Sequence, residues 1–145
     1  MVDAGSRASS RAHRLRAPLL VAAATGALSL ALHLRDPHDG GSWGTCPWLA
    51  LTGRYCPGCG GLRAVNDLTR GDLAGAVSSN LLLVLAVPFA LWMWLSWTGR
   101  AWTGQDRPAP ARTRARTVVL VAAVAVAVAA FTVLRNLPAG SWLAP

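Results

Sequence analysis

Three cysteines carry the chemistry that this sequence could perform. Cys46, Cys56 and Cys59 are the only cysteines among the 145 residues, and they follow one another at the spacing C-x9-C-x2-C. Thiolates are preferred ligands of zinc, which structural sites hold in a tetrahedral set of four. Pro57 fixes one backbone angle of residues 56–60, and the glycines permit the bends that would point both sulfurs inward. We therefore predict a zinc knuckle or a disulfide in this stretch.

A zinc site on these cysteines needs a fourth ligand, because the chain has no fourth cysteine. The predicted ligand set is Cys46, Cys56, Cys59 and His38, with zinc as the ion. The alternatives for the fourth position are His33, Asp39, Asp67 and water.

A disulfide is the alternative to a metal. Thiols outside a membrane meet oxidising conditions, where Cys46 could pair with either Cys56 or Cys59 and leave one thiol free. A C-x2-C pair could also exchange disulfides, but the strand–helix pattern of a thioredoxin fold is absent from the sequence. The cysteines thus allow three interpretations: a structural clasp made by metal or disulfide, a functional thiol or metal centre, and thiols that only pack.

No other motif suggests a reaction. The sequence contains no Ser-His-Asp arrangement, no paired acids within an apolar segment and no Gly-Lys-Ser/Thr phosphate loop. The apolar segments also hold almost no polar residue suited to an ion path. These absences argue against a hydrolase, a nucleotide-binding protein and an autonomous transporter.

The composition indicates a membrane protein. Hydrophobic residues make up 53% of the chain and charged residues only 14%, against about a quarter in soluble domains. All 14 basic residues are arginines, and they lie beside apolar segments rather than along one polar face. This pattern fits membrane topology better than phosphate binding, so we expect contact with a lipid bilayer and no nucleic-acid partner.

Three windows without charge organise the chain: residues 17–34, 73–99 and 117–134. A helix rises about 1.5 Å per residue, so about 18 residues cover about 27 Å of hydrocarbon. A backbone in lipid must satisfy its own hydrogen bonds, which leaves the helix as the realistic structure. We predict an all-α membrane protein with three transmembrane helices, at residues 17–34, 81–97 and 117–134.

The remaining segments differ in character. Residues 1–16 form a basic tail that we expect to be disordered, and residues 98–116 form a basic loop that contains proline. Residues 135–145 form a C-terminal tail. The first span also has the shape of a secretory signal peptide; we expect an uncleaved signal anchor, with cleavage as the alternative.

The first loop, residues 35–80, holds the cysteines and short interfacial helices. Apolar residues recur at helical spacing from Leu62 to Leu68, with Arg63 and Asp67 as an i,i+4 pair on the other side. This pattern predicts a short amphipathic helix that packs the cysteine-containing turn against the helix bundle.

The distribution of arginine predicts the orientation. The side with the N-terminal tail and the second loop holds nine arginines, and the opposite side holds five. Because cytoplasmic segments carry the excess, we place the N-terminus in the cytoplasm and the cysteine loop outside it. The wealth of arginine and alanine indicates a GC-rich bacterial genome, and hence a multi-pass protein of a bacterial cell membrane.

At the cysteine loop the chain resembles a known family. The pattern C-P, then T-G-x-x-C-P-G-C-G-x-x-R-A, then Asn80 before an apolar helix is similar to small bacterial membrane proteins of domain-of-unknown-function family 2752. The resemblance covers Cys46 to Trp97, and this chain has Leu81 where the family often has proline. It implies a multi-pass helical protein and supplies no activity.

The sequence leads to two functional hypotheses. The first is an accessory or interaction protein, rather than an enzyme, with a structural clasp of zinc or disulfide and with another membrane protein or a second copy as its partner. Runs of alanine in the third window would let another helix pack closely. The alternative is a membrane-bound thiol oxidoreductase or metalloenzyme that uses the C-x9-C-x2-C cysteines.

Overall fold

Three long helices dominate the structure, a computed structural model that describes residues 4–105 and 113–145. They are α1 (Ala4–Leu34), α4 (Leu73–Thr103) and α5 (Thr113–Leu134), and each is long and apolar enough to cross a membrane. The described residues contain no strand. The prediction of an all-α protein with three membrane-spanning helices is therefore confirmed.

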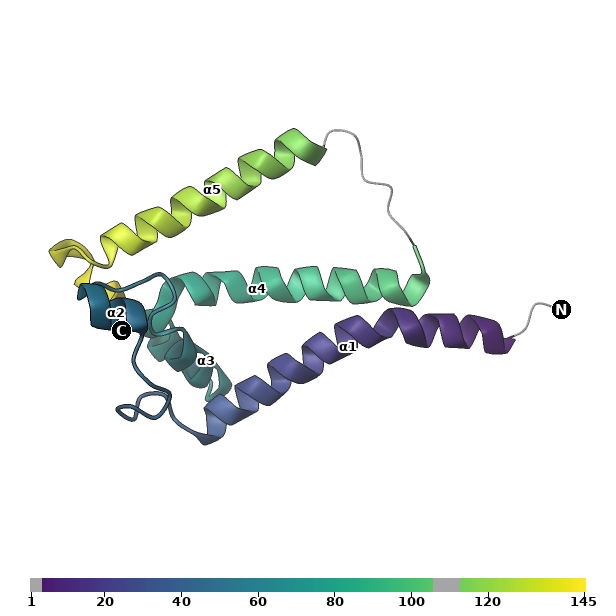
Figure 1. The fold of residues 1–145 in the computed structure, drawn as a ribbon, viewed down its shortest axis with the longest axis horizontal. Helices are drawn as coiled ribbons and strands as arrows, with labels where there is room; N and C mark the ends of the chain where they lie inside the picture. Colours follow the sequence, from purple (N-terminus) through teal and green to yellow (C-terminus); the bar gives the residue numbers. More distant parts are fainter. Residues whose placement is uncertain (1–3, 106–112) are drawn as a thin grey trace.

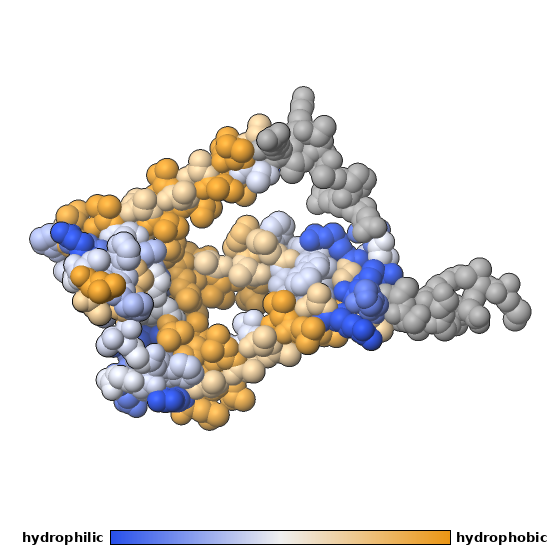
Figure 2. Space-filling model, in the orientation of Figure 1, coloured by the Kyte–Doolittle hydropathy of each residue, from blue (hydrophilic) through white to orange (hydrophobic). Residues whose placement is uncertain are grey.

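Three short helices lie at one end of the long ones (Figure 1). They are α2 (Pro47–Thr52), α3 (Gly61–Thr69) and the 3-10 helix η1 (Pro138–Leu143). Figure 2 shows that this end is mostly polar, that the opposite end carries strongly polar residues, and that an apolar belt over the long helices separates the two. The cysteine loop and the C-terminal segment therefore share one polar end of the molecule.

The long helices differ in length from the predicted spans. Residues 4–16, where the sequence suggests a disordered tail, form the first turns of α1, because alanine and arginine favour helix. α4 extends beyond residues 81–97 at both ends. Of the predicted loop at 98–116, residues 98–103 belong to α4 and residues 106–112 lie outside the described part.

α1 packs on α4 in its N-terminal half and contacts α3 near its other end, whereas α5 diverges from α4 and packs on η1 (Figure 1). Trp94 of α4 donates its indole N–H to the carbonyl oxygen of Pro18 at 3.0 Å, and Arg14 Nε donates to the carbonyl oxygen of Ala101 at 3.0 Å. Two polar bonds thus join α1 and α4 in the half that lies far from the cysteines.

α3 is the predicted amphipathic helix, but its charges pair differently. Arg63 Nε donates to the carbonyl oxygen of Pro37 at 3.4 Å. Asp67 accepts from Ser79 Oγ at 2.8 Å instead. The predicted Arg63–Asp67 ion pair is therefore wrong: the folded loop turns Asp67 toward α4, where it is buried, and Arg63 toward the loop backbone.

Asn80 divides α4 into two helices. Its backbone is non-helical (φ −162°, ψ 93°), and its Oδ1 accepts from the N–H of Leu83 at 2.9 Å. Those are the features of an N-cap, so the part of α4 that crosses the apolar belt begins after Asn80. This break leaves the side-chain amide of Asn80 facing the cysteine loop.

Asn66 joins α3 to the end of α1. It is fully buried, its Nδ2 donates to the carbonyl oxygen of Leu32 at 2.6 Å, and its Oδ1 accepts from Arg70 Nε at 2.9 Å. Leu32 lies in the last turn of α1, whose carbonyls have no partner within the helix. Asn66 therefore satisfies a group that would otherwise be buried without a hydrogen bond.

We expect Asn66→Ala to lower the free energy of unfolding by about 1–3 kcal/mol, because it leaves the Leu32 carbonyl unpaired. Unfolding in mild detergent, followed by circular dichroism, measures the change. The control is Ser78→Ala, which removes an exposed hydroxyl bonded only within its own helix and should stay within about 0.5 kcal/mol. Equal effects of the two substitutions would contradict this role of Asn66.

Candidate metal centre

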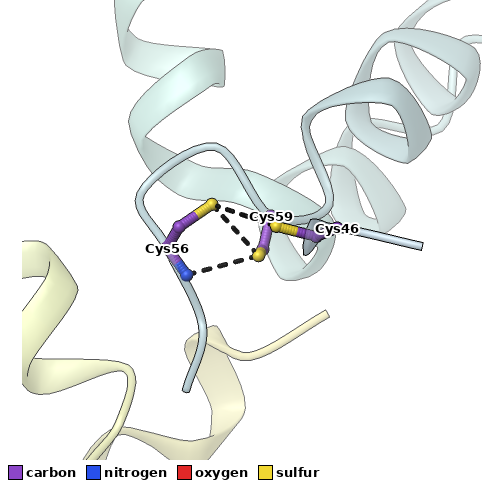
Figure 3. A group of neighbouring side chains, drawn as sticks. All are labelled: Cys46, Cys56 and Cys59. Carbon is purple, nitrogen blue, oxygen red and sulfur yellow. Dashed lines mark hydrogen bonds between the residues drawn. The ribbon is translucent and has the colours of Figure 1, made fainter. Parts of the chain in front are cut away.

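The fold brings the three cysteines together (Figure 3). The Sγ atoms of Cys56 and Cys59 lie 3.2 Å apart, those of Cys46 and Cys56 lie 3.7 Å apart, and all three lie within 4.8 Å of one another. A tetrahedral zinc with Zn–S bonds of about 2.3 Å would separate its sulfurs by about 3.8 Å. All three are free thiols. We call these three residues the cysteine cluster; their sulfurs lie close enough together to share a metal ion.

Short local bonds shape the turn at residues 56–60, which we call the cysteine turn. The N–H of Cys59 donates to the carbonyl oxygen of Cys56 at 3.2 Å, and the N–H of Cys56 donates to Cys59 Sγ at 3.3 Å. Cys46 lies outside this turn, immediately before Pro47, the first residue of α2. Gly53, at φ 66°, then ends α2 and directs the chain back toward the turn.

The three thiols differ in acidity. Burial, with Cys56 beside it, raises the pKa of Cys59 to about 12. The pKa of Cys46 is lowered, chiefly because the backbone N–H of Leu49 at the start of α2 faces its sulfur. Cys46 is thus the thiol that loses its proton most readily, whereas Cys59 keeps its proton at neutral pH.

The carbonyl groups of the cysteine turn accept hydrogen bonds from two side chains that are distant in sequence, one within α4 and one just after α5. Asn80 Nδ2 donates to the carbonyl oxygens of Pro57 at 2.9 Å and Cys59 at 3.0 Å. Arg135, just after α5, donates from Nη1 to the carbonyl oxygen of Cys56 at 2.9 Å and from Nη2 to that of Cys59 at 3.1 Å. The turn therefore links the start of the second span to the end of the third.

Asn136 strengthens this link. Its Oδ1 accepts from the N–H of Tyr55 at 2.9 Å, and its Nδ2 donates to the carbonyl oxygen of Tyr55 at 2.8 Å. Sequence reasoning missed both Arg135 and Asn136, which it placed in a tail. No local signal marks them, since one arginine after an apolar span looks like an ordinary flanking charge.

Arg135 is the most deeply buried charge of the described chain. Its side chain is 1% exposed, its guanidinium carbon lies 4.8 Å from the ring centre of Phe131 and 5.7 Å from that of Tyr55, and its Nε has no hydrogen-bond partner. Burial lowers the pKa of Arg135, and the nearby Cys59 and Cys56 oppose that shift. The described residues offer it no carboxylate partner.

The predicted fourth ligand, His38, contacts acids instead of sulfur. Its Nδ1 lies 2.8 Å from Asp36 Oδ1, and its Nε2 lies 3.4 Å from Asp67 Oδ1. Another candidate, His33, lies 3.0 Å from Thr69 Oγ1 through its Nδ1. Among the described residues no histidine or acid joins the three sulfurs within 4.8 Å, so His38 as a ligand stays a prediction.

Residues 46–94 match the family described as Protein of unknown function (DUF2752). This part of the chain is similar to that family, and the match covers 49 of the 145 residues. No curated protein and no solved structure matches the chain. The DUF2752 region contains the cysteine cluster, α3 and Asn80, whereas α1, α5 and Arg135 lie outside it. The resemblance seen in the sequence is confirmed.

Two glycines of the cysteine turn provide a matched test of its geometry. Gly60 has φ 77°, and a Cβ there would collide with the backbone oxygen of Ser79 and lie 2.6 Å from Pro145 Cβ. A Cβ on Gly58 would meet only Cys56 Sγ, at 3.9 Å. The turn therefore requires glycine at position 60 but not at position 58.

We expect Gly60→Ala to lower the free energy of unfolding by about 1–2 kcal/mol for the left-handed backbone alone, with the collision adding to that cost. Gly58→Ala should change it by less than about 1 kcal/mol. Thermal unfolding of the two variants in detergent gives the comparison. If Gly58→Ala were the more damaging change, the described turn would be incorrect.

Proposed function

We propose that the cysteine cluster is a structural zinc clasp in a membrane-integral accessory protein. The observation that carries this proposal is that the carbonyls of the cysteine turn accept hydrogen bonds from both Asn80 and Arg135. A zinc ion held by Cys46, Cys56 and Cys59 would cross-link α2 to the cysteine turn. The carbonyls that position α4 and α5 would then be fixed in place.

The exposure of α5 explains why such a clasp would be useful. Phe131 is the one residue of α5 that is buried, among those whose side chains are described. Helices in lipid gain no hydrophobic free energy from packing on one another. Polar bonds at the loop end must therefore fix α5, and its free apolar surface is available to another membrane protein or to a second copy of the chain.

A catalytic role is the alternative, favoured by the partial exposure of Cys46 and Cys56. The grooves near the cluster give it little support. One, of about 210 Å³, lies beside Trp48 and Tyr55 at the last turn of α5, and none of its lining residues is a cysteine, a histidine or an acid. Neither that groove nor the larger one beside Arg135 is lined by the cysteine cluster, so an accessory role fits better.

Chelation and substitution test the clasp. We expect the purified protein to hold about one zinc per chain. Removing the zinc, or making Cys59→Ser, should lower the unfolding temperature by at least about 2 °C, the shift that ~1 kcal/mol produces in a chain of about this length. Zinc content and thermal unfolding in detergent, without reductant, are the measurements. A variant that keeps its stability and loses an activity would support the enzyme instead.

The same samples separate the remaining alternatives. A metal-free protein with one free thiol would establish a disulfide between two of the three cysteines; the clasp then requires that the free thiol be Cys56 or Cys59, with Cys46 bonded to the other. His38→Ala tests the predicted fourth ligand: weaker zinc binding would support it. Unchanged binding would leave His38 as a link between Asp36 and Asp67.

The orientation belongs to the proposal. The end of α1 and α4 that lies far from the cysteines carries Arg11, Arg14, Arg16 and Arg100, and over the full sequence that side holds nine arginines against five on the cysteine side. The excess of arginine marks the cytoplasmic side, so the cysteine cluster would face outward from a bacterial cell membrane.

We expect a phosphatase reporter fused after Pro145 to be active and a fluorescent reporter that folds only in the cytoplasm to be dark there. Fusions to the N-terminus should behave in the opposite way. A cytoplasmic reporter after Pro145 would reverse the proposed orientation without affecting the clasp.

A further inference from the structure

We propose that the zinc-loaded cysteine cluster is an anionic tris-thiolate centre with a neutral fourth ligand, and that Arg135 is its buried counter-charge. This inference rests on the proposed zinc clasp and adds its charge state and a positioning residue. It also chooses between the metal and the disulfide, which the spacing of the cysteines leaves open.

The first step is the isolation of the Arg135 charge. The side chain is 1% exposed, and the ion pairs of the described residues involve Asp36, Asp67, His38 and Arg70 but not Arg135. A buried charge without a partner is strongly destabilising, so proteins pair such groups. A counter-charge for Arg135 must come from something that lies against it.

The second step is the position of the guanidinium. Both of its terminal nitrogens donate to the cysteine turn, at Cys56 and Cys59, whose sulfurs lie 3.2 Å apart. Carbonyl oxygens satisfy N–H groups without neutralising a charge, and the rings of Phe131 and Tyr55 shield the group from water. Among the described groups whose charge acts on Arg135, those that can become anionic are the thiols of Cys56 and Cys59 and the phenol of Tyr55. Of these, only the thiols are ligands that zinc would deprotonate.

The third step is the charge balance. Zn²⁺ that binds three thiols displaces three protons to solvent, forms three Zn–S bonds and leaves a centre of charge −1. Together with Arg135 the total is zero. A disulfide or three neutral thiols would leave Arg135 uncompensated, whereas a carboxylate as fourth ligand would leave one negative charge in excess. The balance therefore selects a neutral fourth ligand, either water or an imidazole.

Asn80 is a matched control for Arg135. Both side chains donate to two carbonyl oxygens of the cysteine turn and share that of Cys59, but only Arg135 is charged. The experiment uses the full chain in mild detergent under reducing conditions. It measures zinc affinity by competition with a chromophoric chelator for the wild type, Arg135→Gln, Arg135→Lys and Asn80→Ala.

We expect Arg135→Gln to weaken zinc binding roughly 10–100-fold, the usual range for residues that support metal ligands. Arg135→Lys should recover most of this loss because it keeps the charge, and Asn80→Ala should weaken binding much less than Arg135→Gln. Cobalt substitution should give the charge-transfer absorption of three thiolates in the wild type. Proton release on zinc binding, which needs no variant, should be three per ion.

The outcomes separate the two proposals. A wild-type protein that binds no zinc overturns the clasp and this inference together. Zinc binding that Arg135→Gln leaves unchanged, or that Asn80→Ala weakens equally, overturns the counter-charge and leaves the clasp intact. Should Arg135→Gln not fold, the proton count, taken at a pH where the free thiols are protonated, decides the charge state. Two protons per zinc, or four in both the wild type and His38→Ala, would overturn the tris-thiolate with a neutral fourth ligand.

Discussion

The carbonyl oxygen of Cys59 is the point on which the arrangement of this protein depends. It accepts from Asn80 at 3.0 Å and from Arg135 at 3.1 Å, so one peptide group joins the second and third membrane helices. The helix η1, which contacts both α4 and α5, makes a second connection at the same end, while α5 diverges from α4 over most of its length (Figure 1). Any interaction that fixes the orientation of the Cys59 peptide group therefore also fixes the position of the second span relative to the third.

The importance of this polar junction follows from the solvent. In water, an apolar helix such as α5 would be buried by the hydrophobic effect. In lipid, its valine and alanine side chains are as stable against acyl chains as against another helix. Directional bonds then decide the position of the helix. Those of α5 are concentrated at Arg135 and Asn136, immediately after its last turn. The cysteine turn is thus the natural place for a cross-link.

Sequence alone reveals the local features and misses the junction. Charge-free windows and the crowded cysteines are patterns within short segments, so the three spans and the clustering of the sulfurs can be predicted. The bonds between Arg135 and the turn join residues 76 and 79 positions apart and leave no periodic trace. The pairing of Arg63 with Asp67 fails for a related reason: helical spacing places the two side chains near each other, but tertiary contacts with Ser79 and Pro37 take precedence.

The charge of Arg135 and the predicted orientation favour different chemical states of the cysteines. Outside a bacterial membrane the surroundings favour disulfides, which are neutral. A buried guanidinium that lacks a carboxylate favours an anionic neighbour instead, which under our proposal is the set of thiolates on a bound metal ion. Because the free thiol of Cys59 is raised in pKa by burial, it is a poor nucleophile toward oxidants until a metal takes its proton. Burial therefore protects Cys59 but not Cys46, whose pKa is lowered and whose side chain is partly exposed, so the proposed metal would have to bind before Cys46 is oxidised.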